Sequence, residues 1–162
     1  MTTLATDPLT LVHTAISLLA IVTGLPVLAA MMKGRTPVTL TGIFLGLTVL
    51  TSVTGFLFKN EHVTPAMIVG AISLIILAVA LFAFYGNHLA GRWRTGYVIT
   101  ATMALYLNVF VLVIQSFIKL PPLHALAPAI PPSGPIFGAV QGVVLLAFVV
   151  AGWVAVKARP AA

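Results

Sequence analysis

The chain has 162 residues and a mass of 16.9 kDa; 60% of its residues are hydrophobic, only 6% are charged, and its mean hydropathy is +1.18. Soluble domains carry about 25% charged residues, so this composition excludes a soluble globular protein and predicts an integral membrane protein. The sequence has no cysteine, which excludes disulfides, thiolate-held zinc, iron–sulfur clusters and cysteine nucleophiles. The net charge of +6 reflects basic loops between membrane spans and indicates no nucleic-acid partner.

Five apolar stretches are long enough to cross a membrane. A helix needs about 20 apolar residues to span about 30 Å of hydrocarbon, and a helix satisfies its own backbone hydrogen bonds in lipid. Polar or Pro/Gly-rich segments separate the stretches, which are 11–32, 38–58, 65–85, 97–118 and 136–156. The connections are too short to hold a second domain. The predicted fold class is therefore all-α, a single bundle of five transmembrane helices that comprises residues 1–162.

The basic residues predict the orientation of this bundle. Six of them follow the first, third or fifth stretch, and these are Lys33, Arg35, Arg92, Arg94, Lys157 and Arg159. Lys59 and Lys119 fall on the other side, together with the two acidic residues, Asp7 and Glu61. Because loops rich in Lys and Arg stay in the cytoplasm, we expect an outside N-terminus and a cytoplasmic C-terminus.

Aromatic and basic residues also lie near the expected inner boundary of the membrane. Amphipathic rings favour the headgroup layer, and this predicts an interfacial position for four residues: Tyr85, Trp93, Tyr97 and Trp153. We expect Arg92, Trp93 and Arg94, placed in a basic loop, to bind anionic lipid headgroups. Binding of an anionic substrate by this loop is the alternative.

The first eight residues lack the basic region of a cleaved secretory signal, since they carry no positive charge and include Asp7. We therefore expect the first span to be retained, with Asp7 in a tail that precedes it. The predicted location is the inner membrane of a bacterium.

Small residues predict where helices approach one another. Membrane helices associate through small residues that let backbones come close, and two GxxxG patterns occur, at Gly42 and Gly46 and at Gly138 and Gly142. Each pair marks either a contact, inside the bundle or between subunits, or a chance occurrence, because glycine is common in membrane helices. Thr64 followed by a proline predicts the N-cap of the third span.

The fourth stretch is the most polar span. Its Ala101, Ala104, Asn108 and Gln115 recur at helical spacing and share one face, which should point into the bundle. An unpaired amide at mid-membrane is costly, so Asn108 is expected to form a hydrogen bond to another helix. A quinone carbonyl held by Asn108 or Gln115 is the alternative. Hydroxyls of the second span are expected to bond their own backbone, and these are Thr48, Thr51, Ser52 and Thr54.

Three histidines, His13, His62 and His124, fall toward the expected outer face. Imidazole nitrogens bind zinc or copper, and together with Glu61 they offer a route for protons, so a metal or redox site is one interpretation. The other interpretation is that these side chains are simply solvated or bonded to loops. Haem b is a sharper form of the first interpretation, but it needs two histidines at matching depth, and His13 lies near the opposite boundary from His88.

Four segments resemble a group of small multi-span bacterial inner-membrane proteins to which no function is assigned. They are 11–13 (LVH), 51–56 (TSVTGF), 88–91 (HLAG) and 104–110 (ALYLNVF). The resemblance implies a bacterial inner-membrane protein and carries no chemistry with it. A looser likeness to small b-type cytochrome bundles is weakened by the number of spans and by the depths of the histidines.

Three classes of function remain open. The favoured one is a non-catalytic accessory subunit packed in a larger electron-transfer or transport complex, either with partner subunits or as a homo-oligomer. The second is a small redox protein with haem b, a metal or a quinone, for which His13, Asn108 and Gln115 are the cofactor candidates and His13, His62 and His124 the metal candidates. The third is a carrier or channel for a small solute. An enzyme is disfavoured because acid–base catalysis needs a positioned pair of groups and only two carboxylates exist.

Overall fold

The computed structural model describes residues 7–59 and 62–159, and within these residues the chain is all-helical with no strand. Five helices are long and apolar enough to cross a membrane, as predicted. They are α1 (Pro8–Met32), α2 (Val38–Gly55), α3 (Pro65–Leu81), α4 (Arg92–Lys119) and α6 (Pro135–Lys157). A π-helical turn, η1 (Phe82–Gly86), extends α3, and the short α5 (Pro121–His124) follows α4.

Local sequence signals explain where these helices begin. Thr64 accepts a hydrogen bond from the backbone amide of Met67 and caps α3, as predicted from the proline that follows it. Asp7 does the same for α1, since its carboxylate accepts from the backbone amide of Thr10 at 3.2 Å. The expectation that Asp7 belongs to a tail was therefore wrong. It missed that an aspartate before a proline is itself a helix-start signal.

The predicted spans differ from the helices mainly at α4 and α2. Helix α4 begins at Arg92, five residues before the predicted start, because a helix can continue past the point where its sequence stops being apolar. Arg92, Trp93 and Arg94 are therefore in the first turn of a helix rather than in a loop. Helix α2 ends at Gly55, before the predicted end at Phe58, and the chain leaves it through a turn.

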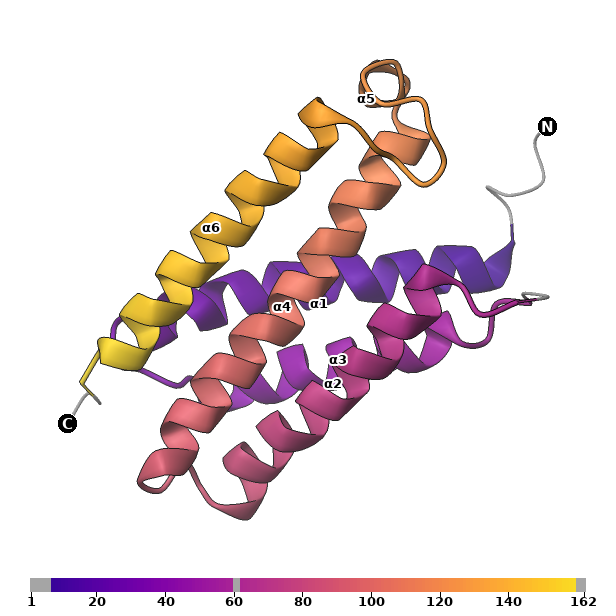
Figure 1. The fold of residues 1–162 in the computed structure, drawn as a ribbon. Coiled ribbons are helices and arrows are strands. Elements are labelled where there is room, and N and C mark those ends of the chain that lie inside the picture. Colours follow the sequence, from indigo (N-terminus) through magenta and orange to yellow (C-terminus); the bar gives the residue numbers. More distant parts are fainter. Residues whose placement is uncertain (1–6, 60–61, 160–162) are drawn as a thin grey trace.

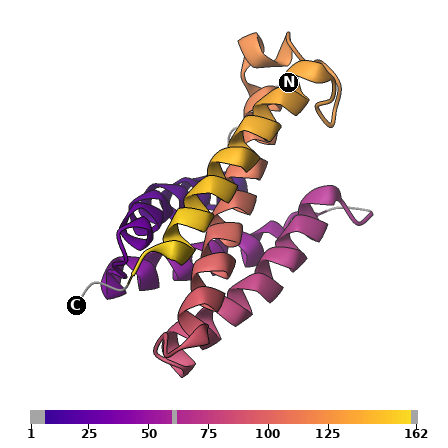
Figure 2. The ribbon, with the colours of Figure 1, turned by 60° about the vertical axis from the view of Figure 1, so that its left-hand side comes forward.

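The helices run alternately up and down, and α4 is the central one. Helices α1 and α2 form one antiparallel pair, and α4 contacts α1, α2, α3 and α6. Figures 1 and 2 show the C-terminal part of α4, α5 and the start of α6 projecting beyond the ends of α1, α2 and α3. Helix α6 is the least covered span, because only Gln141 and Ala155 are buried in it.

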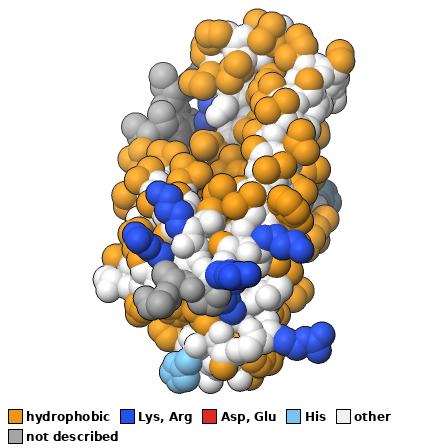
Figure 3. All heavy atoms as spheres, turned by 90° about the vertical axis from the view of Figure 1, so that its left-hand side faces the viewer, with side chains coloured by type: hydrophobic (Ala, Val, Ile, Leu, Met, Phe, Trp, Pro, Cys, Tyr) orange, Lys and Arg blue, Asp and Glu red, His pale blue; other side chains and the backbone are white. Residues whose placement is uncertain are grey.

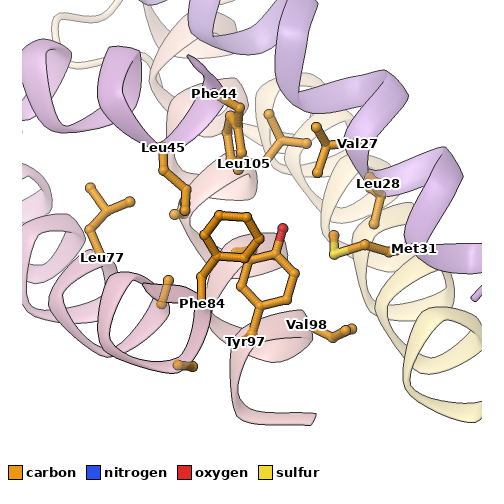
Figure 4. Close-up of a cluster of buried hydrophobic side chains, with 14 of the residues drawn as sticks. Val27, Leu28, Met31, Phe44, Leu45, Leu77, Phe84, Tyr97, Val98 and Leu105 are labelled. Carbon is orange, nitrogen blue, oxygen red and sulfur yellow. The ribbon is translucent and has the colours of Figure 1, made fainter. Parts of the chain in front are cut away.

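The hydrophobic core occupies one half of the bundle. It contains the C-terminal halves of α1 and α3 and the N-terminal halves of α2 and α4, whereas no residue of 8–19, 65–72 or 106–116 is buried. The rings of Phe84 and Tyr97 lie at its centre, 5.6 Å apart, between Met31 of α1 and Leu77 of α3 (Figure 4).

Tyr97 corrects one expectation drawn from the sequence. Its side chain is 0% exposed, and its hydroxyl donates to the Thr41 hydroxyl oxygen at 3.5 Å. It is thus a core residue and does not face the headgroup layer. Tyr85, Trp93 and Trp153 remain 56%, 39% and 63% exposed, as residues at a membrane interface are.

The two ends of the bundle differ in charge. We call the basic end the one where α1, η1 and α6 finish and α2 and α4 begin; its basic residues are Lys33, Arg35, Arg92, Arg94, Lys157 and Arg159. Figure 3 shows Lys and Arg side chains gathered toward the lower part of one face of the molecule, below a broad hydrophobic surface. We call the other end the histidine end, where His13, His62 and His124 lie.

Candidate functional site

His13 is the best-defined polar group at the histidine end. It lies in the second turn of α1 and its Nδ1 is 2.8 Å from the Thr54 hydroxyl oxygen of α2. The ring of Phe58 meets the imidazole edge to face, with centroids 5.1 Å apart. The imidazole also packs on Gly55, where a built Cβ would lie 3.7 Å from the histidine ring. Two helices therefore fix the position of this side chain.

The carbonyls around Thr54, those of Leu50 and Thr51, favour one tautomer of His13. The Thr54 hydroxyl donates its single proton to the backbone carbonyl of Leu50, at 2.7 Å, as residues in helices commonly do. The hydroxyl oxygen can then only accept from His13, so Nδ1 carries the proton in the neutral ring. The lone pair of Nε2 is left to accept a hydrogen bond or to bind a metal.

The other two candidate metal ligands lie apart from a common site. His62 is exposed in the segment before α3, and His124 is half-buried in α5, with its Nδ1 buried and without a hydrogen-bond partner. No group of three or more His, Cys, Asp or Glu side chains that could hold a metal occurs among residues 7–59 and 62–159. Glu61, the carboxylate expected beside them, lies outside the described residues. The structure thus gives no support to a site shared by the three histidines.

The polar face of α4 is only partly turned inward. Ala101 and Ala104 are buried, while Asn108 and Gln115 are half-buried. Asn108 donates from Nδ2 to the Thr48 hydroxyl oxygen of α2 at 3.4 Å, which is the cross-helix hydrogen bond expected of it. This bond occupies one amide proton and explains the residue structurally. It leaves the amide oxygen for other partners.

Gln141 is a buried amide whose role the sequence did not reveal. It is 9% exposed, and its Nε2 donates to the backbone carbonyl of Phe110 at 3.1 Å, which ties α6 to α4. Its Oε1 is buried without a hydrogen-bond partner. A lone glutamine in an otherwise apolar helix was the available signal, because such a group is costly to place toward lipid.

The hydroxyls of α2 follow the prediction with one exception. Thr48, Ser52 and Thr54 each donate to the carbonyl four residues earlier. Thr51 does not, and its buried hydroxyl has no hydrogen-bond partner. Its backbone bonding was therefore wrongly predicted.

The candidate headgroup residues stand at the start of α4. Arg94 is half-buried, and its Nη2 donates to the backbone carbonyl of Ala155, in the last turn of α6, at 3.5 Å. Arg92 and Trp93 are exposed, and the Trp93 ring packs edge to face on Phe82 with centroids 5.1 Å apart. The first turn of a helix is an unfavourable place for cations because of the helix dipole. An external anion at this position would relieve that repulsion.

The four predicted packing glycines behave differently from one another. A Cβ built on Gly42 would lie 2.8 Å from the Tyr85 hydroxyl oxygen, so a side chain approaches closely there. Apart from their own stretch of helix, no atom of residues 7–59 and 62–159 lies within 4 Å of such a Cβ on Gly46, Gly138 or Gly142. These three glycines therefore mark no packing among the described residues, which leaves a contact between subunits or a glycine that simply faces lipid.

Gly24 makes the tightest glycine contact in the described chain, although it belongs to neither GxxxG pattern. A Cβ there would lie 2.5 Å from Leu105 Cδ1 and 2.8 Å from the Phe44 ring. Gly24 was not among the glycines predicted to mark helix packing. Nothing in the spacing of a single glycine shows which neighbours press against it.

Comparison with protein-family models, curated proteins and solved structures finds no match. The function must therefore be argued from the surfaces and side chains of this chain alone.

Proposed function

We propose that the protein is a non-catalytic helical subunit that packs through α6 against another transmembrane helix of a larger membrane assembly. The observation that carries this proposal is the open face around Gly138 and Gly142. Glycine in place of alanine costs a helix about 1 kcal/mol at each position, and packing inside this chain offsets neither cost. Packing of a partner helix against the exposed glycines would offset it, because small residues let two membrane helices approach closely.

The shape of the bundle supports the same proposal. Only two residues of α6 are buried, and the C-terminal part of α4, α5 and the start of α6 project beyond the other helices (Figure 1). The half-buried amide of Gln115 lies in the C-terminal part of α4. A partner there would bury a polar group that the chain itself covers only in part.

The test is purification from the native membrane in mild detergent, with mass spectrometry of every chain that co-elutes. We expect a stoichiometric partner, and we expect the double variant Gly138→Leu/Gly142→Leu to lose it. Ala147→Leu is the matched control, since Ala147 is an exposed small residue half a turn around α6 from Gly138. A homogeneous lone monomer from the wild-type membrane, or equal retention of the partner by both variants, contradicts the proposal.

The orientation forms part of this proposal. We place the protein in the inner membrane of a bacterium, with the basic end in the cytoplasm and the histidine end outside, because six of the eight Lys and Arg residues lie at the basic end. The chain has no cysteine, so a single introduced one can be labelled without background. An impermeant maleimide should label His62→Cys in intact spheroplasts and label Ala158→Cys only after lysis. The reverse pattern would invert the topology.

A redox protein is the second candidate, and the free Nε2 of His13 favours it. An imidazole held by Thr54 with this nitrogen unprotonated is competent to bind haem or a metal, or to accept the proton of a quinol. The same purification tests this role through an absorbance spectrum from about 350 to 700 nm and through metal and quinone analysis. A Soret band that His13→Ala abolishes would move the protein into this class, whereas a colourless preparation with background metal and quinone removes it.

A further inference from the structure

A groove of about 290 Å³ runs along the lipid-facing side of the bundle between α4 and α6. Its walls are apolar, and the side chains that define them are Ile99, Met103 and Tyr106 of α4 and Leu145, Val149 and Trp153 of α6. The exposed fractions of Val149 and Trp153 are 58% and 63%, so this chain leaves the groove open.

The groove exists because a glycine brings the two helices together at its floor. A Cβ built on Gly152 would lie 3.2 Å from Thr102 Cγ2, so the helices are in close contact there. Bulkier side chains rise on both sides of this contact. Further along, the rings of Tyr106 and Phe148 meet edge to face at 5.7 Å. The floor of the groove is thus built from close-packed side chains.

The length of the groove matches one leaflet of a bilayer. Its lining on α6 extends from Leu145 to Val156, and eleven residues of helix rise by about 16 Å. This is about half of the 30 Å hydrocarbon core. The groove opens toward the basic end, since Val156 lies in the last turn of α6. An acyl chain of a lipid in that leaflet would fit its length.

Three basic residues of α4 and α6 lie at the basic end, toward which the groove opens. Arg92 shares a face of α4 with Ile99, Met103 and Tyr106, which follow it by seven, eleven and fourteen residues. Arg94 reaches across to the carbonyl of Ala155, which places its guanidinium between the two helices. Lys157 of α6 comes one turn after Trp153. Among the described residues the one acidic side chain is that of Asp7, and it lies at the histidine end, away from these cations.

We propose that this groove is a binding site for an anionic phospholipid, with one acyl chain along the α4–α6 groove and the phosphate held by Arg92, Arg94 and Lys157. Guanidinium groups bind phosphate through paired, charge-assisted hydrogen bonds, and basic pockets between transmembrane helices bind anionic headgroups. A phospholipid can contact both the apolar groove and the cations, whereas a free anion can contact only the cations. The combination therefore favours a phospholipid. This site is independent of the proposed partner face at Gly138 and Gly142.

The experiment measures lipid selectivity at Trp153 in reconstituted membranes. The sequence has two tryptophans, and Trp93→Phe leaves Trp153 as the only indole while keeping a ring against Phe82. The protein is placed in bilayers of brominated phosphatidylcholine, which quenches Trp153, and unbrominated phosphatidylglycerol is added in increasing fraction. Recovery of fluorescence gives the binding constant of phosphatidylglycerol relative to phosphatidylcholine.

We expect strong selectivity for phosphatidylglycerol, which the double variant Arg92→Gln/Arg94→Gln lowers about 25-fold, or about fivefold for each basic residue. The matched control is Lys33→Gln/Arg35→Gln, which removes the same charge from the same end but outside the groove, and it should change the constant less than about twofold. Val149→Phe fills the groove on an exposed helix face and should abolish the selectivity with every cation still present. Val149→Phe therefore tests the role of the groove even if loss of Arg94 disturbs the contact between α4 and α6.

Three results would overturn the proposal. Equal binding of the two lipids by the wild-type chain would make Trp153 an ordinary site of bulk lipid contact. Equal losses in the two double variants would reduce the effect to the diffuse charge of the basic end. An absence of quenching by brominated lipid would show that a protein helix, from a second copy or a partner, covers the groove instead.

Discussion

Replacement of Gly24 by alanine tests whether the core is as closely packed as the structure has it. The new Cβ would lie 2.5 Å from Leu105 Cδ1 and 2.8 Å from the Phe44 ring, and both side chains are only 1% exposed. Both neighbours belong to the hydrophobic core, so any shift moves them against other buried side chains. Overpacking of this kind costs about 1–3 kcal/mol, while the change from glycine to alanine favours the helix by about 1 kcal/mol.

The same substitution at Gly46 isolates the packing cost. Gly46 lies within α2, and no described atom outside its own stretch of helix comes within 4 Å of a Cβ at this position, so Gly46→Ala receives the helix gain without the clash. The difference between the two variants is then the overpacking cost alone. We expect Gly24→Ala to be less stable than Gly46→Ala by about 1–3 kcal/mol, which is about 5- to 150-fold in the unfolding equilibrium.

The assay is reversible unfolding of the purified chain in mixed micelles, with sodium dodecyl sulfate as denaturant and tryptophan fluorescence and helical circular dichroism as readouts. The variant Leu105→Ala provides a second check. It removes the nearest obstructing atom, so Gly24→Ala should cost less in the Leu105→Ala background than in the wild type. Equal stability of Gly24→Ala and Gly46→Ala, or a cost that Leu105→Ala leaves unchanged, would refute the close packing of α1 against α2 and α4.

Three further predictions use the same unfolding assay. Tyr97→Ala should cost about 3–5 kcal/mol because it empties a fully buried site, whereas Tyr97→Phe should cost less than about 1 kcal/mol because the bond to Thr41 is long, at 3.5 Å; similar losses in both variants would make the hydroxyl the essential group. A double-mutant cycle of His13→Ala and Thr54→Val should give a coupling of about 0.6–1.7 kcal/mol, and additive losses would mean that the 2.8 Å bond contributes nothing. Asp7→Ala should destabilise by about 1 kcal/mol through loss of the cap of α1, and Asp7→Asn, which can still cap, should be close to the wild type.

The sequence predicted the five spans well because hydropathy and length report directly on passage through lipid. It predicted poorly which residues face one another. Tyr97 sits at a boundary by hydropathy, yet the early start of α4 carries it one and a half turns into the helix, where it enters the core. Hydropathy measures the solvent around a segment, and it contains no information on the rotation of one helix against the next.

The same limit explains the candidate site. Asn108 could be predicted to bond across the bundle because a buried amide needs a partner anywhere within reach, but the identity of that partner, Thr48, depends on the register of α4 against α2. The contact of His13 with Thr54 depends on the register of α1 against α2 in the same way. Residue spacing along one helix predicts which side chains share a face. A site also depends on how two helices are positioned relative to each other.

The glycines differ in whether their cost to helix stability is offset by packing within the chain. Gly24 and Gly152 each cost their helix stability, and each is offset within the chain, by the close contacts with Leu105 and with Thr102. Gly138 and Gly142 bear the same cost, and no other helix of the described chain packs against them. Helix α6 therefore carries two kinds of glycine, one that fixes it to α4 beside the lipid groove and one that only a neighbour outside the chain can use. A partner helix packed against Gly138 and Gly142 would cover α6, the helix with the fewest buried residues of the five spans.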